Sequence, residues 1–103
     1  MMEFESIVLN IITKSGSARS SAMEAIQYAK NNESEKAKES IRAAEENIAL
    51  AHKEQTMLIQ EESKGKKVEV SLLLVHAQDH LMNAITLKDL AQEFVNIYNK
   101  ISE

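Results

Sequence analysis

The sequence predicts an all-α protein, an antiparallel up-down-up bundle of three long helices in a single domain over residues 1–103. Three observations support this fold class. The 103 residues include no proline and only two glycines, so little in the chain interrupts a helix. Apolar residues recur with the 3.6-residue period of a helix along most of the chain. Turn-forming residues gather in two short segments, and long helices joined by short turns pack antiparallel.

The first helix is expected over about residues 3–30. Its apolar and small residues form one stripe at helical spacing: Phe4, Ile7, Val8, Ile11, Ile12, Ser15, Ala18, Ala22, Ala25, Ile26 and Ala29. Gly16 weakens this helix by roughly 1 kcal/mol relative to alanine. A glycine kept there suggests a kink, or a backbone that something approaches closely. The helix should end in the turn at residues 31–34, because asparagine tolerates the left-handed conformation.

The second and third helices are expected over about residues 34–63 and 69–101. Alanine occupies many contact positions of the second helix, which permits close packing. Gly65 is a plausible C-terminal cap, and Lys64, Lys66 and Lys67 beside it are expected to form a solvated loop. The third helix is apolar around nearly its whole circumference near residues 72–75 and 81–85. Because two neighbouring helices cannot surround such a helix, we expect it to pack against copies of itself in a homo-oligomer.

The composition excludes several classes of function. There is no cysteine, which removes disulfides and thiolate metal sites and fits a cytoplasmic protein. The formal net charge of −4 argues against nucleic acid or an anionic membrane as the main partner, since both favour a basic surface. No apolar run approaches the roughly 20 residues of a membrane span, and the acidic N-terminus is unlike a signal peptide. We therefore expect a soluble intracellular protein without direct membrane insertion.

The segment 76–80, with the sequence HAQDH, places chemically active side chains within the apolar third helix. His76 and His80 are four residues apart and share a helix face. Asp79 lies about 300° around the helix from His76, displaced toward the neighbouring apolar residues. Burying such groups is costly unless they are paired, bound to a metal or used in chemistry. This segment is therefore the candidate functional site.

Three interpretations of the segment stay open on the residues alone. The side chains could be polar groups satisfied at an interface, with Asp79 as the hydrogen-bond partner of the histidines. They could bind zinc or iron, but the segment lacks the glutamates of the metalloprotease and di-iron patterns and would need a ligand from His52 or another subunit. Alternatively, one imidazole could be a nucleophile while the other donates a hydrogen bond to the transferred group.

Three motifs together indicate a family. They are residues 74–82 (LVHAQDHLM), residues 51–56 (AHKEQT), and residues 3–8 with 15–20 (EFESIV and SGSARS). In this order they resemble the active-site signature, the second-helix motif Ala-His-x-x-Gln-Thr and the N-terminal helix of the enzyme IIA component of lactose/cellobiose-type phosphotransferase systems. The resemblance extends over the whole chain.

This resemblance implies a fold, a reaction and partners. Members of the family are homotrimers of three-helix subunits, which agrees with the oligomer expected from the third helix. His76 would accept a phosphoryl group from the histidine-containing phosphocarrier protein and pass it to a cysteine on the enzyme IIB component of a sugar transporter. The chain would thus be a phosphotransferase component with a phosphohistidine intermediate, which completes no turnover without its partners.

The resemblance also implies that Asp79 gathers around a divalent metal on the trimer axis. Carboxylates that converge in an apolar interface repel one another unless a cation or protons compensate. A hard cation such as Mg²⁺ suits an all-oxygen site. We therefore expect one divalent cation per trimer, Mg²⁺, which holds the trimer together rather than taking part in the chemistry.

The remaining roles are hypotheses about the phosphoryl site. His80 and Gln78 are candidates to bind phosphoryl oxygens or to orient His76. Gly16 and Ser17 are candidates to bring a backbone N–H or a hydroxyl to the phosphate, with a solvated helix serine as the alternative for Ser17. We expect no chemistry from Arg19, Ser20 and Ser21, and a packing or capping role for His52.

The residue at position 77 bears on the transported sugar, and an alternative function stays open. Ala77 stands where lactose-type members tend to have glycine, whereas alanine is typical of cellobiose- and chitobiose-type members. We therefore expect a role in uptake and phosphorylation of cellobiose or a related β-linked disaccharide, although the membrane IIC component selects the sugar. The rival hypothesis is a metal-stabilised oligomeric helical adaptor without turnover, which uses the same His/Asp cluster structurally.

Overall fold

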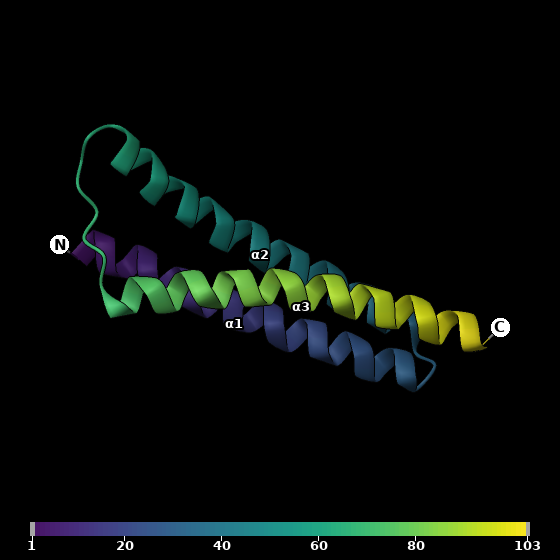
Figure 1. Cartoon of the computed structure of the whole chain (residues 1–103). Coiled ribbons are helices and arrows are strands. Elements are labelled where there is room, and N and C mark those ends of the chain that lie inside the picture. Colours follow the sequence, from purple (N-terminus) through teal and green to yellow (C-terminus); the bar gives the residue numbers. More distant parts are fainter. Residues whose placement is uncertain (1, 103) are drawn as a thin grey trace.

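The computed structural model describes residues 2–102 and consists of three long helices (Figure 1). They are α1 (Met2–Lys30), α2 (Ser34–Ser63) and α3 (Leu72–Ser102), and the described residues contain no strand. α2 returns alongside α1, and α3 starts at the end of the molecule where α1 starts. The molecule measures 55 × 20 × 19 Å. The prediction of an all-α chain with three long helices is confirmed. No helix within residues 2–102 combines the length and the apolar composition that crossing a bilayer requires.

Backbone hydrogen bonds close the turn between α1 and α2. Asn32 has a φ of 62°, the left-handed conformation predicted for this turn. This conformation lets the N–H of Glu33 donate to the carbonyl of Tyr28 at 2.9 Å, which satisfies a carbonyl at the end of α1. The hydroxyl of Ser102 donates to Oδ1 of Asn32 at 2.7 Å. The last turn of α3 is thereby tied to the first connection of the chain.

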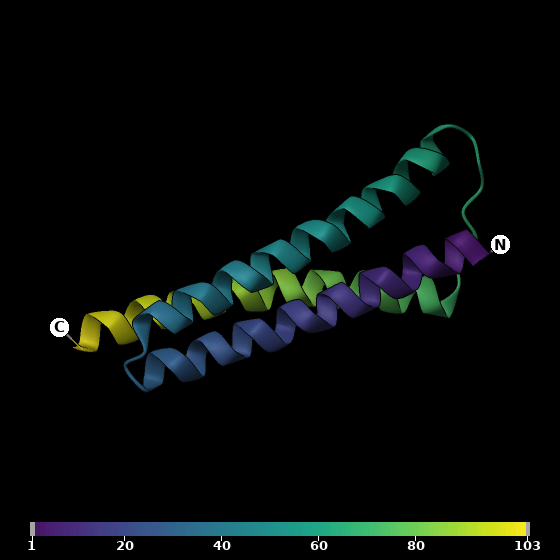
Figure 2. The same ribbon diagram turned by 180° about the vertical axis from the view of Figure 1, so that it is seen from behind.

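The opposite end of the bundle is more open. Figure 2 shows the C-terminal end of α2 standing apart from α1 and α3, with the second connection bridging the space. Gly65 has a φ of 88°, as predicted for a residue that ends a helix. α3 begins at Leu72, later than the expected start near residue 69. The reason is Ser71, whose hydroxyl accepts from the N–H of Leu74 at 3.1 Å and whose carbonyl accepts from the N–H of Val75 at 3.0 Å.

The core consists of two clusters stacked along the bundle. The cluster near the first connection is dominated by alanine: Ala18, Ala22, Ala25, Ala29, Ala37, Ile41, Ala44, Ala84, Ala91 and Val95. The cluster near the open end contains larger side chains: Val8, Ile11, Ala51, Leu58, Leu74, Ala77 and Leu81. Ser15 is buried on α1 between residues of the two clusters, at 1% exposure, and its hydroxyl has no hydrogen-bond partner.

α3 is covered on one side only. Its buried residues are Leu74, Ala77, Leu81, Ala84, Ala91 and Val95. The opposite side carries an apolar stripe that is exposed in the single chain, here called the open stripe of α3: Leu72, Val75, Met82, Leu90, Phe94, Ile97 and Ile101. As the sequence predicted, two neighbouring helices do not cover this helix.

α1 continues through Gly16 as one helix. A Cβ atom added at Gly16 would meet no atom within 4 Å. The expected close approach to this glycine is therefore not made by any described part of the same chain.

Candidate active site

The segment 76–80 lies in the second and third turns of α3, close to the open end of the bundle. The hydroxyl of Ser71 caps the helix just before it. Ala77 and Leu81 anchor the segment in the core cluster that also contains Val8 and Ile11 of α1. Because these anchors leave the remaining side chains of the segment outside the core, the polar groups are held in place without being buried.

His76 and His80 come together as predicted. Their ring centroids are 4.4 Å apart, and the planes meet at 67° in an edge-to-face arrangement. His76 is exposed and His80 is half-buried. One imidazole is thus open to a reaction partner, while the second lies one turn away and is placed to donate to the first ring or to a group bound on it.

Asp79 is exposed and lies within the open stripe of α3. A shallow groove on this surface is lined by Leu72, Leu73, Val75, His76 and Asp79. Residues 2–102 contain no group of three His, Cys, Asp or Glu side chains able to hold a metal ion. Asp79 can therefore serve as a metal ligand only together with groups from other copies or partners.

Gln78 faces away from the two histidines. Two residues along a helix correspond to a rotation of about 200°, so Gln78 and His76 occupy nearly opposite sides of α3. Oε1 of Gln78 accepts a hydrogen bond of 2.6 Å from Nε2 of Gln55 on α2. The structure therefore brings Gln78 to Gln55 and not to His76 of the same chain. The contact gives Gln55, a residue of the AHKEQT motif, a partner that its sequence position alone did not reveal.

Gly16 and Ser17 lie further along the bundle than His76. Ala18 belongs to the alanine-rich cluster, whereas the core residues around His76 belong to the other cluster. Ser17 is exposed and lies seven residues after Asn10, hence on the same helix face. Asn10 Nδ2 donates to Glu54 Oε1 of α2 at 3.3 Å, so this face is turned toward α2. Within one chain, Ser17 is not beside His76.

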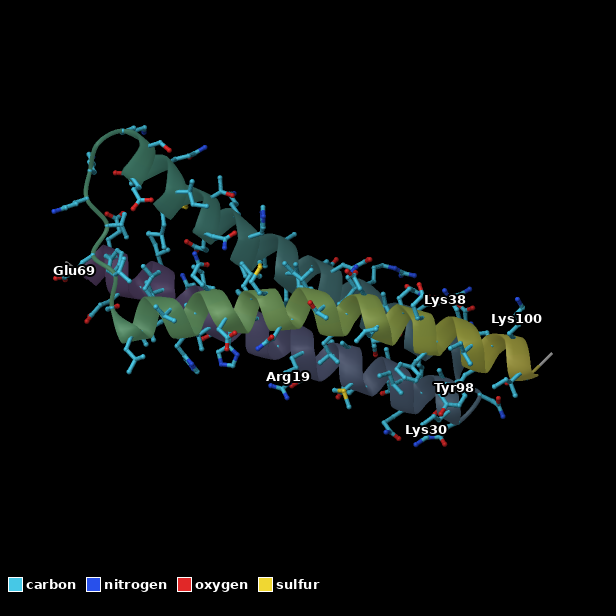
Figure 3. All side chains as sticks on the ribbon, viewed as in Figure 1. Arg19, Lys30, Lys38, Glu69, Tyr98 and Lys100 are labelled. Atoms are coloured by element: carbon cyan, nitrogen blue, oxygen red, sulfur yellow. The ribbon has the colours of Figure 1, made fainter. Side chains whose placement is uncertain are left out.

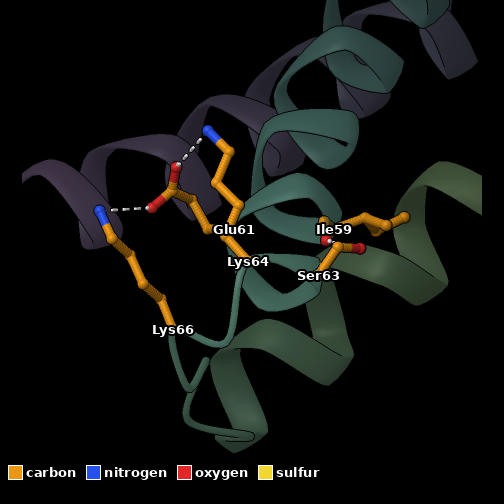
Figure 4. A network of polar contacts seen from close by, with 5 residues as sticks. All are labelled: Ile59, Glu61, Ser63, Lys64 and Lys66. Atoms are coloured by element: carbon orange, nitrogen blue, oxygen red, sulfur yellow. Dashed lines mark hydrogen bonds and ion pairs between the residues drawn. The ribbon is translucent and has the colours of Figure 1, made fainter.

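The remaining singled-out residues lie at the surface. Lys64 and Lys66 both pair with Glu61, at 3.9 and 3.2 Å (Figure 4), in agreement with the predicted solvated loop. Arg19 projects from α1 and is exposed (Figure 3). His52 is also exposed, in the middle of α2, so the expected packing role is not found in the single chain.

Comparisons with known proteins find relatives that match almost the whole chain. Residues 6–99 match the family model described as "PTS system, Lactose/Cellobiose specific IIA subunit". The lichenan-specific phosphotransferase enzyme IIA component of Bacillus subtilis is 52% identical over 101 residues, covering 98% of this chain and 92% of that protein. The crystal structure of the PTS cellobiose-specific enzyme IIA from Bacillus anthracis is similar with a TM-score of 0.95 and 52% identity, covering 99% of this chain and 94% of that one. The IIA(Chitobiose)–HPr complex of Escherichia coli contains a similar chain, with a TM-score of 0.85 and 35% identity over 97% of both chains.

Proposed function

The chain belongs to the lactose/cellobiose-specific IIA family of the phosphotransferase system, and we propose that it carries a phosphoryl group on His76. The group comes from the histidine-containing phosphocarrier protein, HPr, and goes to the cysteine of a IIB component. The observation that supports this role is the exposed imidazole of His76 with His80 beside it, at 4.4 Å between ring centroids. The chain thus acts as a phosphotransferase component whose turnover requires both partners.

Each transfer is a displacement at phosphorus. A neutral nitrogen of His76 attacks the phosphorus of the HPr phosphohistidine, a new N–P bond forms, and the donor imidazole leaves as its own N–P bond breaks. In the second step the IIB thiolate attacks the phosphorus on His76, an S–P bond forms, and His76 leaves as its N–P bond breaks. Such reactions depend on positioning and on neutralising the charge of the phosphoryl oxygens. His80 orients His76 or donates to these oxygens.

The functional unit is a homotrimer of up-down-up bundles joined through α3. The support is the open stripe of α3, in which Leu72 is 86% and Ile101 72% exposed. Apolar area left in water costs about 25 cal/mol per Å². Parallel packing of the three α3 helices covers this stripe along its whole length and needs no further partner.

Asp79 of each chain binds a divalent cation on the trimer axis, with Mg²⁺ as the expected ion. The donor set fits, because Asp79 is an exposed carboxylate within the open stripe and three copies supply three carboxylates to one point. The cation balances charges that otherwise repel within an apolar contact. Its role is to stabilise the assembly, while His76 and His80 act on the phosphoryl group.

The same family membership supports the proposed partners. HPr is the donor, a role supported by the E. coli chitobiose relative that forms a complex with HPr. The acceptor is a IIB component, and the chain works in the cytoplasm without inserting into the membrane. The lichenan- and cellobiose-specific relatives at 52% identity support a role in the uptake of cellobiose or a related β-linked disaccharide.

Reconstitution of the phosphoryl chain tests the proposed site. The protein is mixed with phosphoenolpyruvate, the general phosphotransferase enzyme and HPr, and its intact mass is measured. We expect one acid-labile phosphate per chain for the native protein and for His52→Ala, which removes another exposed histidine of the same chain. His76→Ala should gain none. Phosphorylation of His76→Ala would overturn the assignment, and its absence from the native protein would favour a non-catalytic adaptor.

The metal is tested separately from the chemistry. Sedimentation should show a trimer for the native protein in Mg²⁺. In EDTA, this trimer should dissociate at a higher protein concentration, because the metal that stabilises it has been removed. Asp79→Asn should make the trimer insensitive to EDTA while phosphorylation of His76 continues. If EDTA affects the native protein and Asp79→Asn equally, Asp79 is not the ligand.

A further inference from the structure

Two contacts between α2 and α3 show how the helices lie side by side. Nε2 of Gln55 donates to Oε1 of Gln78 at 2.6 Å, and Nζ of Lys88 lies 3.6 Å from Oε2 of Glu45. Ten residues separate the two contacts on α2 (45 to 55), and ten separate them on α3 (78 to 88). Because the two helices run in opposite directions and rise equally per residue, each residue of this part of α2 has a residue of α3 at the same height.

Thr56 lies on the edge of α2 that is turned toward α3. It is the last residue of the AHKEQT motif, and the proposed function assigns it no role. It follows Gln55 by one residue, which places it level with Ala77, the neighbour of His76 in α3. Eleven residues separate it from Glu45, a net rotation of about 20°, so both residues share the edge of α2 that reaches α3. Thr56 therefore stands beside α3 at the height of the histidine.

The hydroxyl of Thr56 is a donor that its own chain does not use. The residue is half-buried, and within residues 2–102 the hydroxyl forms no hydrogen bond. A serine or threonine inside a helix can donate to the carbonyl four residues earlier. Ser63 of α2 does so, with 2.9 Å to the carbonyl of Ile59 (Figure 4). The Thr56 hydroxyl makes no such bond and remains available to another molecule.

The α3 trimer brings this edge of α2 to another copy. Asp79 lies in the open stripe of α3, and Gln78 and His76 lie on its two sides, about 100° and 60° away in opposite directions. In a ring of three parallel α3 helices, one side of each stripe meets one neighbour and the other side meets the other neighbour. The side with Gln78 also carries α2. Thr56 of one copy therefore faces His76 of the next copy, at nearly the same height.

We infer that the Thr56 hydroxyl of one copy donates a hydrogen bond to the phosphoryl group carried by His76 of the next copy. The inference rests on the proposed phosphocarrier function and on its α3 trimer. A hydrogen bond to a charged phosphoryl oxygen is stronger than one between neutral groups, and a donor that is already in place needs no reorganisation. Thr56 is thus a catalytic residue supplied by α2, and the AHKEQT motif forms a wall of the neighbouring site.

The first experiment removes the hydroxyl and then restores it. Thr56→Val keeps the shape of the side chain without the donor, and Thr56→Ala removes the donor with a smaller side chain. We expect the rate of phosphoryl transfer at saturating phosphorylated HPr to fall about 10-fold in both variants, with little change in KM for HPr. Thr56→Ser keeps the hydroxyl and should stay within about 2-fold of the native rate. A native rate in Thr56→Val, or a rate in Thr56→Ser as low as in Thr56→Val, would overturn the inference. Circular dichroism and sedimentation check that the variants fold and form trimers.

Mixed trimers decide which copy supplies the hydroxyl. In the first mixture one tagged chain carries Thr56→Val and its two companions carry His76→Ala. In the second the tagged chain is native and the companions carry both substitutions, so each trimer again has one acceptor histidine. We expect the first mixture to transfer at the rate of a native tagged chain with two His76→Ala companions, and the second about 10-fold more slowly. The reverse order would mean that Thr56 acts within its own chain, and equal rates would mean that it does not act on the phosphoryl group. Either result would overturn the inference.

The same measurements separate this inference from the proposed function. Native protein that gains no phosphate from HPr would overturn the proposed function itself. Native protein that gains phosphate on His76 but sediments as a single chain would overturn the inference alone, because Thr56 would then have no neighbouring copy to act on.

Discussion

The two sides of α3 differ in what covers them, although both are apolar. The inner side contacts α1 and α2 and is rich in alanine, with Ala77, Ala84 and Ala91 each at most 1% exposed. The outer side carries mostly larger residues, and Met82 and Phe94 remain 49% and 46% exposed. Small side chains let the helices of one chain approach closely, whereas large ones bury more area per contact. Much of the bulky apolar surface of α3 is therefore left uncovered within a single chain.

The polar groups of α3 follow the same division. Asp79 lies on the outer side, while His76 and Gln78 lie on the two flanks where the sides meet. A group on a flank is held by the fold of its own chain and remains accessible to another molecule. In the proposed function, assembly uses the open stripe and the chemistry takes place along its edges.

The largest effect on stability should come from the inner side. Leu81 is fully buried, and Leu81→Ala is expected to lower the free energy of unfolding by about 2–5 kcal/mol through lost burial and the cavity that remains. The adjacent Met82→Ala is the matched control, because it shortens a half-exposed side chain. Urea unfolding at several protein concentrations measures both. Met82→Ala should mainly make the urea midpoint more dependent on protein concentration. An equal loss of unfolding free energy in both variants would contradict the difference between the inner and outer sides of α3.

A charge on the outer side should break assembly and leave the chain helical. Phe94→Glu places a carboxylate in the open stripe, where three copies would bring three charges together. We expect the sedimenting mass to fall from that of a trimer to that of a single chain, with most of the helical circular dichroism retained. Gln27→Glu adds the same charge at an exposed position of α1 and should leave the trimer intact. A Phe94→Glu trimer as stable as the native one would mean that the stripe is not the contact.

The sequence contains enough information for the helices and for the placement of the two histidines. Helical period, the absence of proline and the residues Asn32 and Gly65 predict where α1 and α2 lie and end. The spacing of four residues also predicts that His76 and His80 meet. All these features are local, since each depends on residues within one or two helical turns.

The contacts between helices could not be predicted from the sequence, because they depend on which neighbour each helix face meets. Gln78 stands two residues from His76 in the chain, yet it contacts Gln55 on another helix. Gly16 was expected near a close contact, and within the chain it has none. Periodicity defines the faces of a helix but not their partners, and the outer side of α3 has no partner within one chain.

Ser15 of α1 is a buried polar residue whose removal should stabilise the chain. The Ser15 hydroxyl is buried without a partner, and an unsatisfied buried donor costs about 1–3 kcal/mol. We expect Ser15→Ala to raise the free energy of unfolding by about 1 kcal/mol in urea titrations, with helix propensity adding to the gain. Ser17→Ala, at an exposed position of the same helix, isolates the propensity contribution. If Ser15→Ala raises the free energy of unfolding no more than Ser17→Ala does, the buried hydroxyl of Ser15 does not destabilise the fold.

The smallest effect is expected where a charge links α3 to α2. Lys88 Nζ lies 2.8 Å from Asp89 and 3.6 Å from Glu45 of α2, and the side chain is 20% exposed. The hydrogen bond to Asp89, aided by the charges of Asp89 and Glu45, raises the pKa of Lys88 above the ordinary lysine value of 10.5, although burial opposes the shift. A raised pKa means that the folded chain favours the protonated form. The stabilisation is therefore complete below pH 10.5 and is lost as the pH rises through the higher folded value.

Lys88→Met should accordingly lower the free energy of unfolding by only about 0.5–1 kcal/mol, because both carboxylate partners are largely exposed. Urea unfolding should give the same difference from the native protein at pH 7 and pH 9. Lys38→Met is the control, since Lys38 pairs at 3.6 Å with Glu35 within α2 and joins no second helix. If the difference in unfolding free energy shrinks between pH 7 and pH 9, Lys88 loses its proton well below its raised pKa. The polar link between α2 and α3 would then depend on Gln55 and Gln78 rather than on charge.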